Sequence, residues 1–468
     1  MVNAGGCLIL PGFVNTHSHL AMTLLRGVAD DLALMDWLEN YIFPAEVEFV
    51  DPEFVRIGTE VSCWEMIRGG TTTFVDMYYY PDTISEVIES CGMRALISAT
   101  VIDQRSPDAE DAGDSIRKGS GFIERWLGKN DRITPIFGPH ANYTLNAEQL
   151  TATREAAMKF GVPISIHLSE SPYEVQYAKD NYGMTSIDLF ESIGFFDGPT
   201  IAAHVVWPTE EEIPILARRK VGVIHNPTSN MKIASGVAPV AKMIDAGVRV
   251  GLGTDGAASN NDLDMWEEMR LAAFLQKVDR MDPTVIPAST VLSMATRGGA
   301  TAIGLGEKIG SLEPGKRADL IQVALQNFIK FVQSQVDPVV GDPALREIVS
   351  ADALRAVAGS DQLAPLLCLL ALLFFLLRRI FLARVRAISS AYDYTVLLIA
   401  TTPFMTGFLA YHHLFDYDTV VLLHVLSGEI MLMAIPFTKL VHMPYFFINR
   451  FVLVHENTLG AGGSRTWR

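Results

Sequence analysis

Two histidines placed two residues apart are the first sign of chemistry in this sequence. His17 and His19 lie in Phe13–Leu20, which reads FVNTHSHL and begins as a short apolar segment. Side chains at positions i and i+2 of a strand point to the same face, so both imidazoles can bind one cation. A lone histidine on a strand is more often a packed core residue, but two at this spacing favour a metal site.

A third histidine and a carboxylate could complete the set of ligands. His167 lies in ISIHLSE and Asp255 lies in VGLGTDG. Three imidazoles and one carboxylate suit Zn²⁺, with Fe²⁺ or Mn²⁺ as alternatives, and they leave a position for water. A bound metal would lower the pKa of that water to about 7, and Asp255 could accept its proton. The alternative for Asp255 is a turn residue, because Asp-Gly favours turns.

Other polar side chains could act on a substrate at the same place. Glu170 stands three residues after His167 and could protonate a ring nitrogen and carry protons to a leaving amine. His204, in IAAHVVW, could orient the water or a tetrahedral intermediate, with a backbone-bonded core histidine as the alternative. His225, in HNPTSN, is expected to be structural or to line the substrate site.

These side chains all fall at the ends of expected strands. Short apolar segments that end in polar residues recur eight times, at Gly12–His17, Thr71–Met77, Arg94–Ile102, Ile133–His140, Pro163–Glu170, Thr200–Trp207, Gly222–Asn230 and Val248–Asp255. Helix-like segments separate them, for example Ala147–Phe160, Glu210–Lys220 and Pro239–Ala246. Strand then helix, eight times, predicts an α/β fold of the (β/α)8 barrel type, with its chemistry at the carboxyl ends of the strands.

Charge and hydropathy divide the chain into two unlike parts. Over 468 residues the net charge is −16, which argues against nucleic acid as a partner, and the mean hydropathy is +0.24. Residues 1–326 carry 43 acidic and 26 basic side chains, whereas residues 327–468 carry 10 and 11. Four cysteines without CxxC spacing argue against a disulfide scaffold and fit a reducing compartment.

The first part resembles a known superfamily. The stretches that carry the resemblance are PGFVNTHSHL, GPHANYT, ISIHLSES, AAHVVW, HNPTSNMKIASG and GLGTDGAASNNDLDMW, in this order. They look like the metal-dependent amidohydrolases, and most like the 5-methylthioadenosine/S-adenosylhomocysteine deaminases, beside guanine deaminases and triazine hydrolases. The resemblance covers about residues 1–325. It implies hydrolytic deamination at C6 of an adenosine-type substrate, such as 5-methylthioadenosine or S-adenosylhomocysteine, to the inosine analogue and ammonia.

The resemblance also implies roles for individual residues. The implied metal ligands are His17, His19, His167 and Asp255. The implied catalytic residues are Glu170, His204 and Asp255. The implied substrate-binding residues are Trp37, Glu46, His140 and Glu170. Glu46 could accept two hydrogen bonds from a ribose diol, or it could be a solvated acid at a helix start. Trp37 could instead pack on the barrel, and the family's arginine for a homocysteine carboxylate could be Arg117 or Arg125.

The second part contains long apolar runs. Leu363–Leu377 with Ile380–Ala383, Tyr394–Tyr411 and Thr419–Leu440 are three expected membrane spans. Arginines between the first two spans place that loop and the C-terminus in the cytoplasm by the positive-inside rule. The hydrolase part carries no export signal and is expected in the cytoplasm, which conflicts with the outside position that this topology gives it.

Two histidines near the ends of the third span suggest a haem site. His424 and His442 are 18 residues apart, five helical turns, so they share one face at a separation of about 27 Å. That arrangement suits two haems across a bilayer better than one metal ion. Residues 337–456 resemble the cytochrome b (gamma) subunit of respiratory nitrate reductase, which implies haem b, quinol oxidation and partner subunits of a respiratory complex. His412 or His413 could supply a second ligand near His424.

The expected fold is therefore a (β/α)8 barrel with a truncated β-sandwich remnant, followed by an all-α transmembrane segment. The expected boundaries are a hydrolase barrel over 1–306, the β-sandwich remnant over 307–326, a linker or amphipathic segment over 327–362, three transmembrane helices over 363–456 and a tail over 457–468. The favoured function is the deaminase. The alternatives are a haem b subunit that oxidises quinol and a non-functional chimeric reading frame. The expected partners are a purine nucleoside and membrane lipid along 363–442, and a homo-oligomer of the barrel stays open.

Overall fold

The computed structural model describes residue 4, residues 6–324, a few positions between 402 and 409, and residues 416–434. The chain divides into two units, Met1–Glu347 and Ile348–Arg468. The finer domain boundaries expected from the sequence stay predictions.

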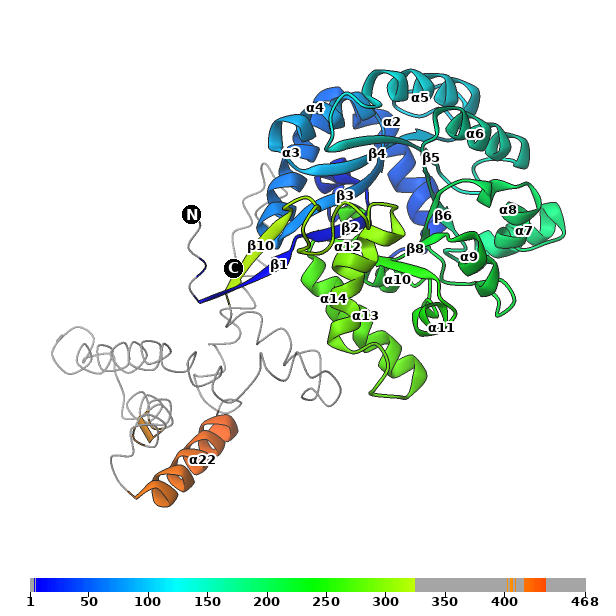
Figure 1. Cartoon of the computed structure of the whole chain (residues 1–468). Coiled ribbons are helices and arrows are strands. Elements are labelled where there is room, and N and C mark those ends of the chain that lie inside the picture. The colour runs from blue at the N-terminus through cyan, green and yellow to red at the C-terminus, as the bar shows by residue number, and fades with distance from the viewer. Residues whose placement is uncertain are drawn as a thin grey trace, which may run out of the picture. The chain divides into compact units, whose positions relative to one another are not determined.

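Eight parallel strands form the sheet of the first unit, and neighbours in the sheet are neighbours in the sequence (Figure 1). The strands are β2 (Phe13–Ser18), β3 (Thr71–Tyr78), β4 (Arg94–Val101), β5 (Ile133–Pro139), β6 (Ile164–Leu168), β7 (Thr200–His204), β8 (Gly222–His225) and β9 (Arg249–Leu252). They overlap all eight segments expected from the sequence. The predicted (β/α)8 architecture is therefore confirmed for this unit.

Side chains join the first barrel strand to the last. The Thr16 hydroxyl donates to the Leu252 carbonyl at 2.7 Å. The amide of Asn15 donates to Thr254 Oγ1 at 2.8 Å, and the backbone N–H of Thr254 donates to Asn15 Oδ1 at 3.0 Å. All of these groups are buried, so each bond is made where water cannot replace it. The barrel closes at the point where the chain places its first and last candidate ligands.

Helices cover the outside of the barrel (Figure 1). The longer ones are α3 (Pro52–Gly69), α4 (Pro81–Cys91), α5 (Ala112–Trp126), α6 (Ala147–Phe160), α7 (Pro172–Tyr182) and α13 (Met265–Arg280). The shorter ones are α8 (Ser186–Ser192), α9 (Ile213–Arg219), α10 (Pro227–Lys232), α11 (Val240–Asp245), α12 (Ala257–Asn260), α14 (Ala288–Ser293) and α15 (Gly299–Ala302). The loop after β2 contains η1 (Leu20–Leu25), α1 (Leu34–Trp37), η2 (Leu38–Ile42) and α2 (Phe43–Phe49). Two further turns are η3 (Phe195–Asp197) and η4 (Met294–Gly298).

Helix α6 shows how local sequence sets these boundaries. Asn146 accepts a hydrogen bond from the backbone of Gln149, and the Gln149 side chain accepts one from the backbone of Asn146, both at 2.9 Å. This capping box satisfies two N–H groups that the first turn leaves open. Gly161, at φ +68°, ends the helix in the left-handed conformation that glycine adopts readily. The helix has the bounds expected from the sequence.

An apolar layer fills the barrel below the site. It is formed by buried side chains from six strands and from the segment after η4, namely Val14, Val75, Leu96, Ile136, Ile201, Ile224, Ala300, Ala302, Ile303 and Ile309. A Cβ atom at Gly222 would lie 2.0 Å from the carbonyl oxygen of Ala302, so only glycine allows α15 to approach β8 this closely. This packed layer supports the polar side chains at the carboxyl ends of the strands.

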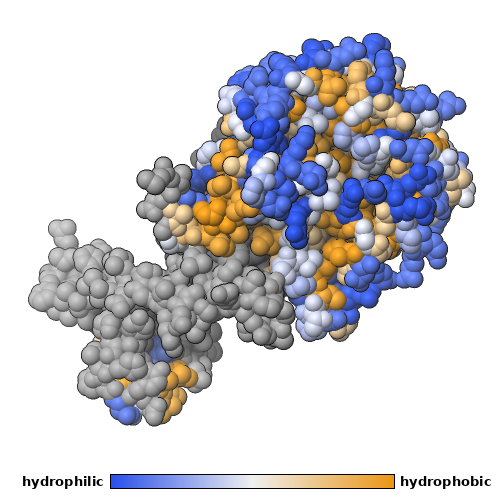
Figure 2. Space-filling model, viewed as in Figure 1, coloured by the Kyte–Doolittle hydropathy of each residue, from blue (hydrophilic) through white to orange (hydrophobic). Residues whose placement is uncertain are grey.

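A two-stranded antiparallel sheet accompanies the barrel. Strand β1 (Cys7–Pro11) pairs with β10 (Leu320–Ala324), with Leu8 opposite Val323. Strand β10 lies within 307–326, the range predicted for the β-sandwich remnant, whereas β1 lies within the range predicted for the barrel. Leu320 is 44% exposed. Figure 2 shows a mainly hydrophilic barrel face with hydrophobic residues interspersed. This sheet therefore leaves an apolar side chain exposed, and the truncated β-sandwich stays a prediction.

Helix α22 (Tyr417–Ala434) is the regular helix described in the second unit. Its 18 residues rise about 27 Å, and its sequence includes two acidic residues. Among the described residues, no helix is both long and apolar enough to cross a membrane. This finding overturns the predicted membrane localisation, and with it the predicted transmembrane helices, for the described part of the chain. The expected span at 363–383 and most of that at 394–411 lie outside the described residues.

We expect Asn15→Ala to weaken barrel closure. The change leaves the buried backbone N–H of Thr254 without its acceptor and removes the hydrogen bond that the Thr254 hydroxyl accepts, which should lower the free energy of unfolding by about 1–3 kcal/mol. Urea denaturation followed by circular dichroism measures this quantity. Asn181→Ala is the matched control, because Asn181 is exposed and donates only to a carbonyl in its own helix. An equal loss in the free energy of unfolding for the two substitutions would contradict the role of Asn15 in closing the barrel.

Candidate active site

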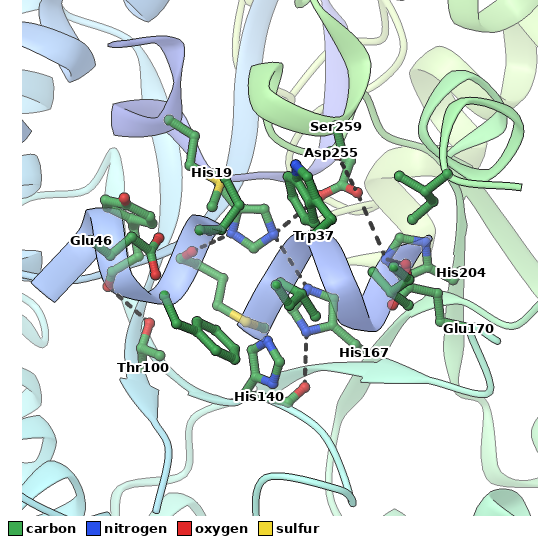
Figure 3. A pocket seen from close by; sticks show the side chains of 18 of the residues that line it. His19, Trp37, Glu46, Thr100, His140, His167, Glu170, His204, Asp255 and Ser259 are labelled. Carbon is green, nitrogen blue, oxygen red and sulfur yellow. Dashed lines mark hydrogen bonds and ion pairs between the residues drawn. The ribbon is translucent and has the colours of Figure 1, made fainter. Parts of the chain in front are cut away.

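A cavity opens at the carboxyl ends of the barrel strands (Figure 3). The site residues expected from the sequence that line it are His19, Trp37, Glu46, His140, His167, Glu170, His204 and Asp255. His17 lies just behind this wall, with its ring centroid 4.8 Å from that of His19 and 4.9 Å from that of His167. The structure therefore brings the candidate residues of the barrel to one place.

Four candidate ligand atoms converge on one side of this cavity. His19 Nε2 lies 3.1 Å from Asp255 Oδ1, and His17 Nε2 lies 3.4 Å from the same oxygen. His167 Nε2 lies 3.3 Å from His19 Nε2. The ligand atoms of His17, His19 and His167 all lie within 4.8 Å of one another, and so do those of His17, His204 and Asp255. Each atom is a nitrogen or oxygen donor, so a cation could be held where these two sets meet.

Backbone carbonyls orient two of these imidazoles. Nδ1 of His19 lies 2.5 Å from the Met77 carbonyl oxygen, and Nδ1 of His167 lies 2.9 Å from the His140 carbonyl oxygen. A carbonyl can only accept, so each Nδ1–H donates and each Nε2 keeps its lone pair toward the cavity. Metal-binding histidines typically have their second nitrogen held in this way.

Two serines orient the carboxylate. Ser229 donates to Asp255 Oδ2 at 2.6 Å, and Ser259 donates to the same oxygen at 3.1 Å. The other oxygen, Oδ1, therefore faces the imidazoles of His17 and His19. The backbone also fixes this carboxylate, because the N–H of Asp255 donates to the His17 carbonyl at 3.0 Å.

His17 gives a direct test of whether these residues fit a metal. Its side chain is fully buried, and neither ring nitrogen makes a hydrogen bond with good geometry within the described residues. Buried polar atoms normally have a partner. A cation held between His17 and Asp255 would provide it, so the donor set fits the metal expected from the sequence.

The electrostatics of the cluster also favour a positive charge at its centre. Burial lowers the pKa of His17 to about 4, against the opposing effect of Asp255. Burial acts in the same direction on His19, but its hydrogen bond and attraction to Asp255 prevail and raise the pKa to about 9. Burial opposes ionisation of Asp255, yet its bonds to His17 and His19 hold its pKa well below the usual range. The carboxylate is thus ionised and surrounded by imidazoles.

Glycines allow the ligand-bearing strands to come this close. A Cβ atom at Gly253 would lie 2.6 Å from Asn226 Oδ1 and 2.8 Å from the backbone nitrogen of His17. Asp255 itself adopts φ +63°, a left-handed conformation that turns its side chain back over the strand ends. In the GLGTDG stretch, Gly253 is therefore needed for the close approach of the strands, and Asp255 supplies the carboxylate.

Glu170 and His204 stand on the opposite side of the ligand cluster from Glu46 (Figure 3). His204 Nε2 lies 3.9 Å from Glu170 Oε1 and 4.0 Å from Asp255 Oδ2. Nδ1 of His204 lies 2.9 Å from Asn230 Oδ1, which accepts its proton and leaves Nε2 toward the cavity. Burial, assisted by the charge of Asp255, raises the pKa of Glu170 against the attraction of His204. Glu170 thus keeps a proton to higher pH than an exposed glutamate does.

Trp37 and Glu46 come from the helical loop after β2. Glu46 is only 3% exposed, so it is not a solvated helix-start acid. It accepts a hydrogen bond from the Tyr79 hydroxyl at 3.2 Å, and burial raises its pKa to about 7 against the bonds from Tyr78 and Tyr79. Trp37 is buried and lines the cavity together with His140. These side chains define the end of the cavity away from Glu170.

Several candidates lie elsewhere. His225 is buried but does not line the cavity, which favours its structural alternative. Arg117 pairs with Asp114 and Arg125 pairs with Asp82, both on the outside of the barrel. Among the described residues, no lysine or arginine lines the cavity.

The haem histidines can be placed only in part. His424 lies on α22, where its Nδ1 is 3.3 Å from Thr406 Oγ1. His442, His412 and His413 lie outside the described residues. The haem b site therefore stays a prediction without structural support.

Sequence reasoning missed the residues that hold the ligands in place. Ser229 and Asn230 stand in HNPTSN, and Ser259 stands four residues after Asp255. The helical spacing of Ser259 was a usable signal, because α12 starts at Ala257 and returns its side chain toward Asp255. Asn230 and Ser229 carried no such signal, since their contacts cross between strands.

Comparison with known proteins gives the family. The model of the amidohydrolase family matches residues 8–357. The chain belongs to the amidohydrolase family. Over 318 residues it is 46% identical to the 5-methylthioadenosine/S-adenosylhomocysteine deaminase of Thermodesulfovibrio yellowstonii, covering 68% of this chain and 72% of that protein. Over 322 residues it is 45% identical to the 5'-deoxyadenosine deaminase of Methanococcoides burtonii, covering 69% of this chain and 73% of that protein.

Solved amidohydrolase structures share the fold. An adenosine deaminase from Xanthomonas campestris with bound zinc superposes with a TM-score of 0.68 at 38% identity, over 74% of this chain and 76% of that one. The atrazine chlorohydrolase of Arthrobacter aurescens, complexed with zinc, gives 0.65 at 25% identity, over 74% and 80%. The predicted enzyme class, a metal-dependent hydrolytic deaminase, is confirmed. The family match ends at residue 357 and gives no support to the predicted nitrate reductase-like segment or its haem.

We expect Ser229→Ala to weaken metal binding without unfolding the protein. Loss of its hydrogen bond to Asp255 should free the carboxylate to rotate and reduce affinity for zinc by about 10- to 100-fold. Competition of the purified protein with a chromogenic chelator measures the affinity. Ser192→Ala, which removes a hydroxyl bonded only within α8, serves as the control. Unchanged zinc affinity in Ser229→Ala would refute the supporting role.

Proposed function

We propose that this chain removes the 6-amino group of a 5'-modified adenosine by hydrolysis, releasing ammonia and the inosine analogue. The observation that carries the proposal is the convergence of three imidazole nitrogens and one carboxylate oxygen beside Glu170 and His204. The deaminases of T. yellowstonii and M. burtonii, whose names specify adenosine derivatives modified at the 5' position, support the substrate class.

The metal would be held by His17, His19, His167 and Asp255. Zinc suits these nitrogen and oxygen donors, and the X. campestris relative contains it. Iron and manganese stay as alternatives for the same donors. When bound, the ion would act as a Lewis acid and lower the pKa of a water molecule to about 7.

Proton transfer falls to the buried side chains at the strand ends. Glu170, whose pKa burial raises, donates its proton to the ring nitrogen next to C6. It then takes the remaining proton of the attacking water from the hydroxyl group formed at C6 and passes it to the departing amine, and the proton that Asp255 accepts restores Glu170. His204, with its Nδ1 proton held by Asn230, offers Nε2 to orient water or the oxygen that forms at C6. Asp255 is the ionised group that can accept the proton of the attacking water.

The other side chains that line the cavity would select the nucleoside. The buried carboxylate of Glu46 is suited to accept hydrogen bonds from the two ribose hydroxyls. Trp37 and His140 provide flat surfaces for the adenine and ribose. Because no lysine or arginine among the described residues lines the cavity, a neutral 5' group suits it better than a homocysteine carboxylate does.

We expect the zinc-loaded full chain to release ammonia from 5-methylthioadenosine and 5'-deoxyadenosine. A coupled ammonia assay should give a kcat/KM for these two substrates at least about 10-fold above that for S-adenosylhomocysteine, because a buried unpaired carboxylate is costly. Guanine should not react, and chelator treatment followed by zinc should abolish and restore activity. No ammonia from any adenosine derivative would refute the proposed function.

We expect Glu46→Gln to remove the preference for a ribose 2'-hydroxyl. The ratio of kcat/KM for 5'-deoxyadenosine over 2',5'-dideoxyadenosine should fall by about 10-fold, as loss of a charged hydrogen bond predicts. Because burial raises the pKa of Glu46 to about 7, the wild-type ratio should rise as pH increases through 7 and the carboxyl group ionises. Glu39→Gln, an exposed glutamate of the same loop, is the control. A pH-independent ratio, unchanged by Glu46→Gln, would contradict this role.

A further inference from the structure

Glu174 is a fully buried carboxyl group close to the proposed proton-transfer residue. It stands in the first turn of α7, and its side chain does not line the cavity. It therefore has no direct access to a substrate. Burying a carboxyl group is costly unless it makes hydrogen bonds, so its contacts indicate what it does.

The two oxygens of Glu174 accept hydrogen bonds from two consecutive backbone N–H groups. Ser169 N donates to Oε1 and Glu170 N donates to Oε2, both at 2.8 Å. Ser169 adopts φ +49°, a left-handed conformation that costs a non-glycine residue free energy. The carboxyl group of Glu174 thus holds the backbone of Glu170 in a conformation that the chain would not otherwise prefer.

These bonds differ from those of an ordinary helix cap. Ser171 is the N-cap of α7 and accepts from the backbone of Glu174 at 3.3 Å, so the S-P-Y-E stretch looks like a capping box. In a capping box, however, the glutamate side chain bonds to the N-cap residue itself. Here it reaches one and two residues further back, to the residues that place Glu170 in the cavity.

The same backbone segment also connects to the loop of His204. The carbonyl of Ser169 accepts hydrogen bonds from the backbone N–H groups of Val206 and Trp207, both at 3.0 Å. These residues stand two and three positions after His204. Glu174 therefore supports a segment that joins the backbones of Glu170 and His204, whose side chains lie 3.9 Å apart.

We propose that Glu174 is a positioning residue that fixes the place of the Glu170 carboxyl group relative to His204 and the reacting ring. This inference rests on the proposed function of Glu170. It assigns Glu174 no contact with substrate or metal, so it should act on the chemical step and leave binding alone.

The first test is Glu174→Gln in the zinc-loaded full chain. The amide keeps the size of the side chain but sets an N–H group against a backbone N–H group. We expect kcat for deamination of 5-methylthioadenosine to fall by about 10- to 100-fold, the effect of misplacing a catalytic group by about 1 Å. KM and the bound zinc should stay within about twofold of the wild type, since the metal ligands and the nucleoside contacts expected for Trp37, Glu46 and His140 do not change.

The second test is a double-mutant cycle with Glu170→Gln. If Glu174 acts through Glu170, Glu174→Gln should lower the residual kcat of Glu170→Gln by no more than about twofold. Asp114→Asn is the matched control, because Asp114 is also a buried carboxylate that accepts from a backbone N–H group, that of Glu110, but it stands on α5, away from this loop. The control should leave kcat within about twofold of the wild type.

Each outcome decides the inference. A kcat of Glu174→Gln close to the wild type, or an equal loss in the Glu170→Gln background, would overturn it. A wild-type rate for Glu170→Gln would instead refute the proposed role of Glu170, whereas an inactive Glu170→Gln with a normal Glu174→Gln would refute the positioning role alone. If circular dichroism shows that Glu174→Gln does not fold, Glu174→Asp replaces it in the same cycle with the same criteria.

Discussion

The buried carboxylate of Asp255 is the interaction on which the rest of the site depends. An ionised carboxyl group in the interior is costly unless it is paired and hydrogen-bonded. Two serine hydroxyls satisfy Oδ2, while Oδ1 faces the imidazoles of His17 and His19. The backbone N–H of Gly256 also donates to Oδ1, and this arrangement leaves Oδ1 beside two imidazole nitrogens, where it can serve as a metal ligand. The fold supplies the condition, because only barrel closure brings the first strand and the last strand within bonding distance.

Much of this site could be predicted because the ends of strands have a recognisable sequence pattern. An apolar segment followed by histidine or aspartate marks both the strand and its carboxyl end, and a barrel brings all such ends to one face. His17, His19, His167 and Asp255 were found in this way, and the structure places them together. The helical loop with Trp37 and Glu46 followed only from resemblance, since no local pattern states that its residues face the cavity.

The residues that position the catalytic and ligand side chains have no comparable sequence pattern. Glu174 looks like a helix cap in the sequence, and Asn230 and Ser229 look like loop residues. Their function depends on contacts between different strand ends, which spacing along one strand cannot show. The apolar runs beyond residue 363 suggested membrane spans by their composition. Most of these residues lie outside the described part of the chain, and within that part no helix is both long and apolar enough to cross a membrane.

A common backbone feature links the residues that carry the chemistry. Ser169, His204, Val205 and Asp255 all adopt positive φ, between +46° and +72°, although none is glycine. Such conformations cost of order 1–3 kcal/mol each and persist only where neighbours enforce them. Three of the four are held by a backbone hydrogen bond to another element: Ser169 donates to the Glu174 side chain of α7, Val205 to the Leu168 carbonyl and Asp255 to the His17 carbonyl. The loops after these strands therefore stabilise one another's backbone conformations. A substitution in any of them should first change the relative positions of the Glu170 and His204 side chains.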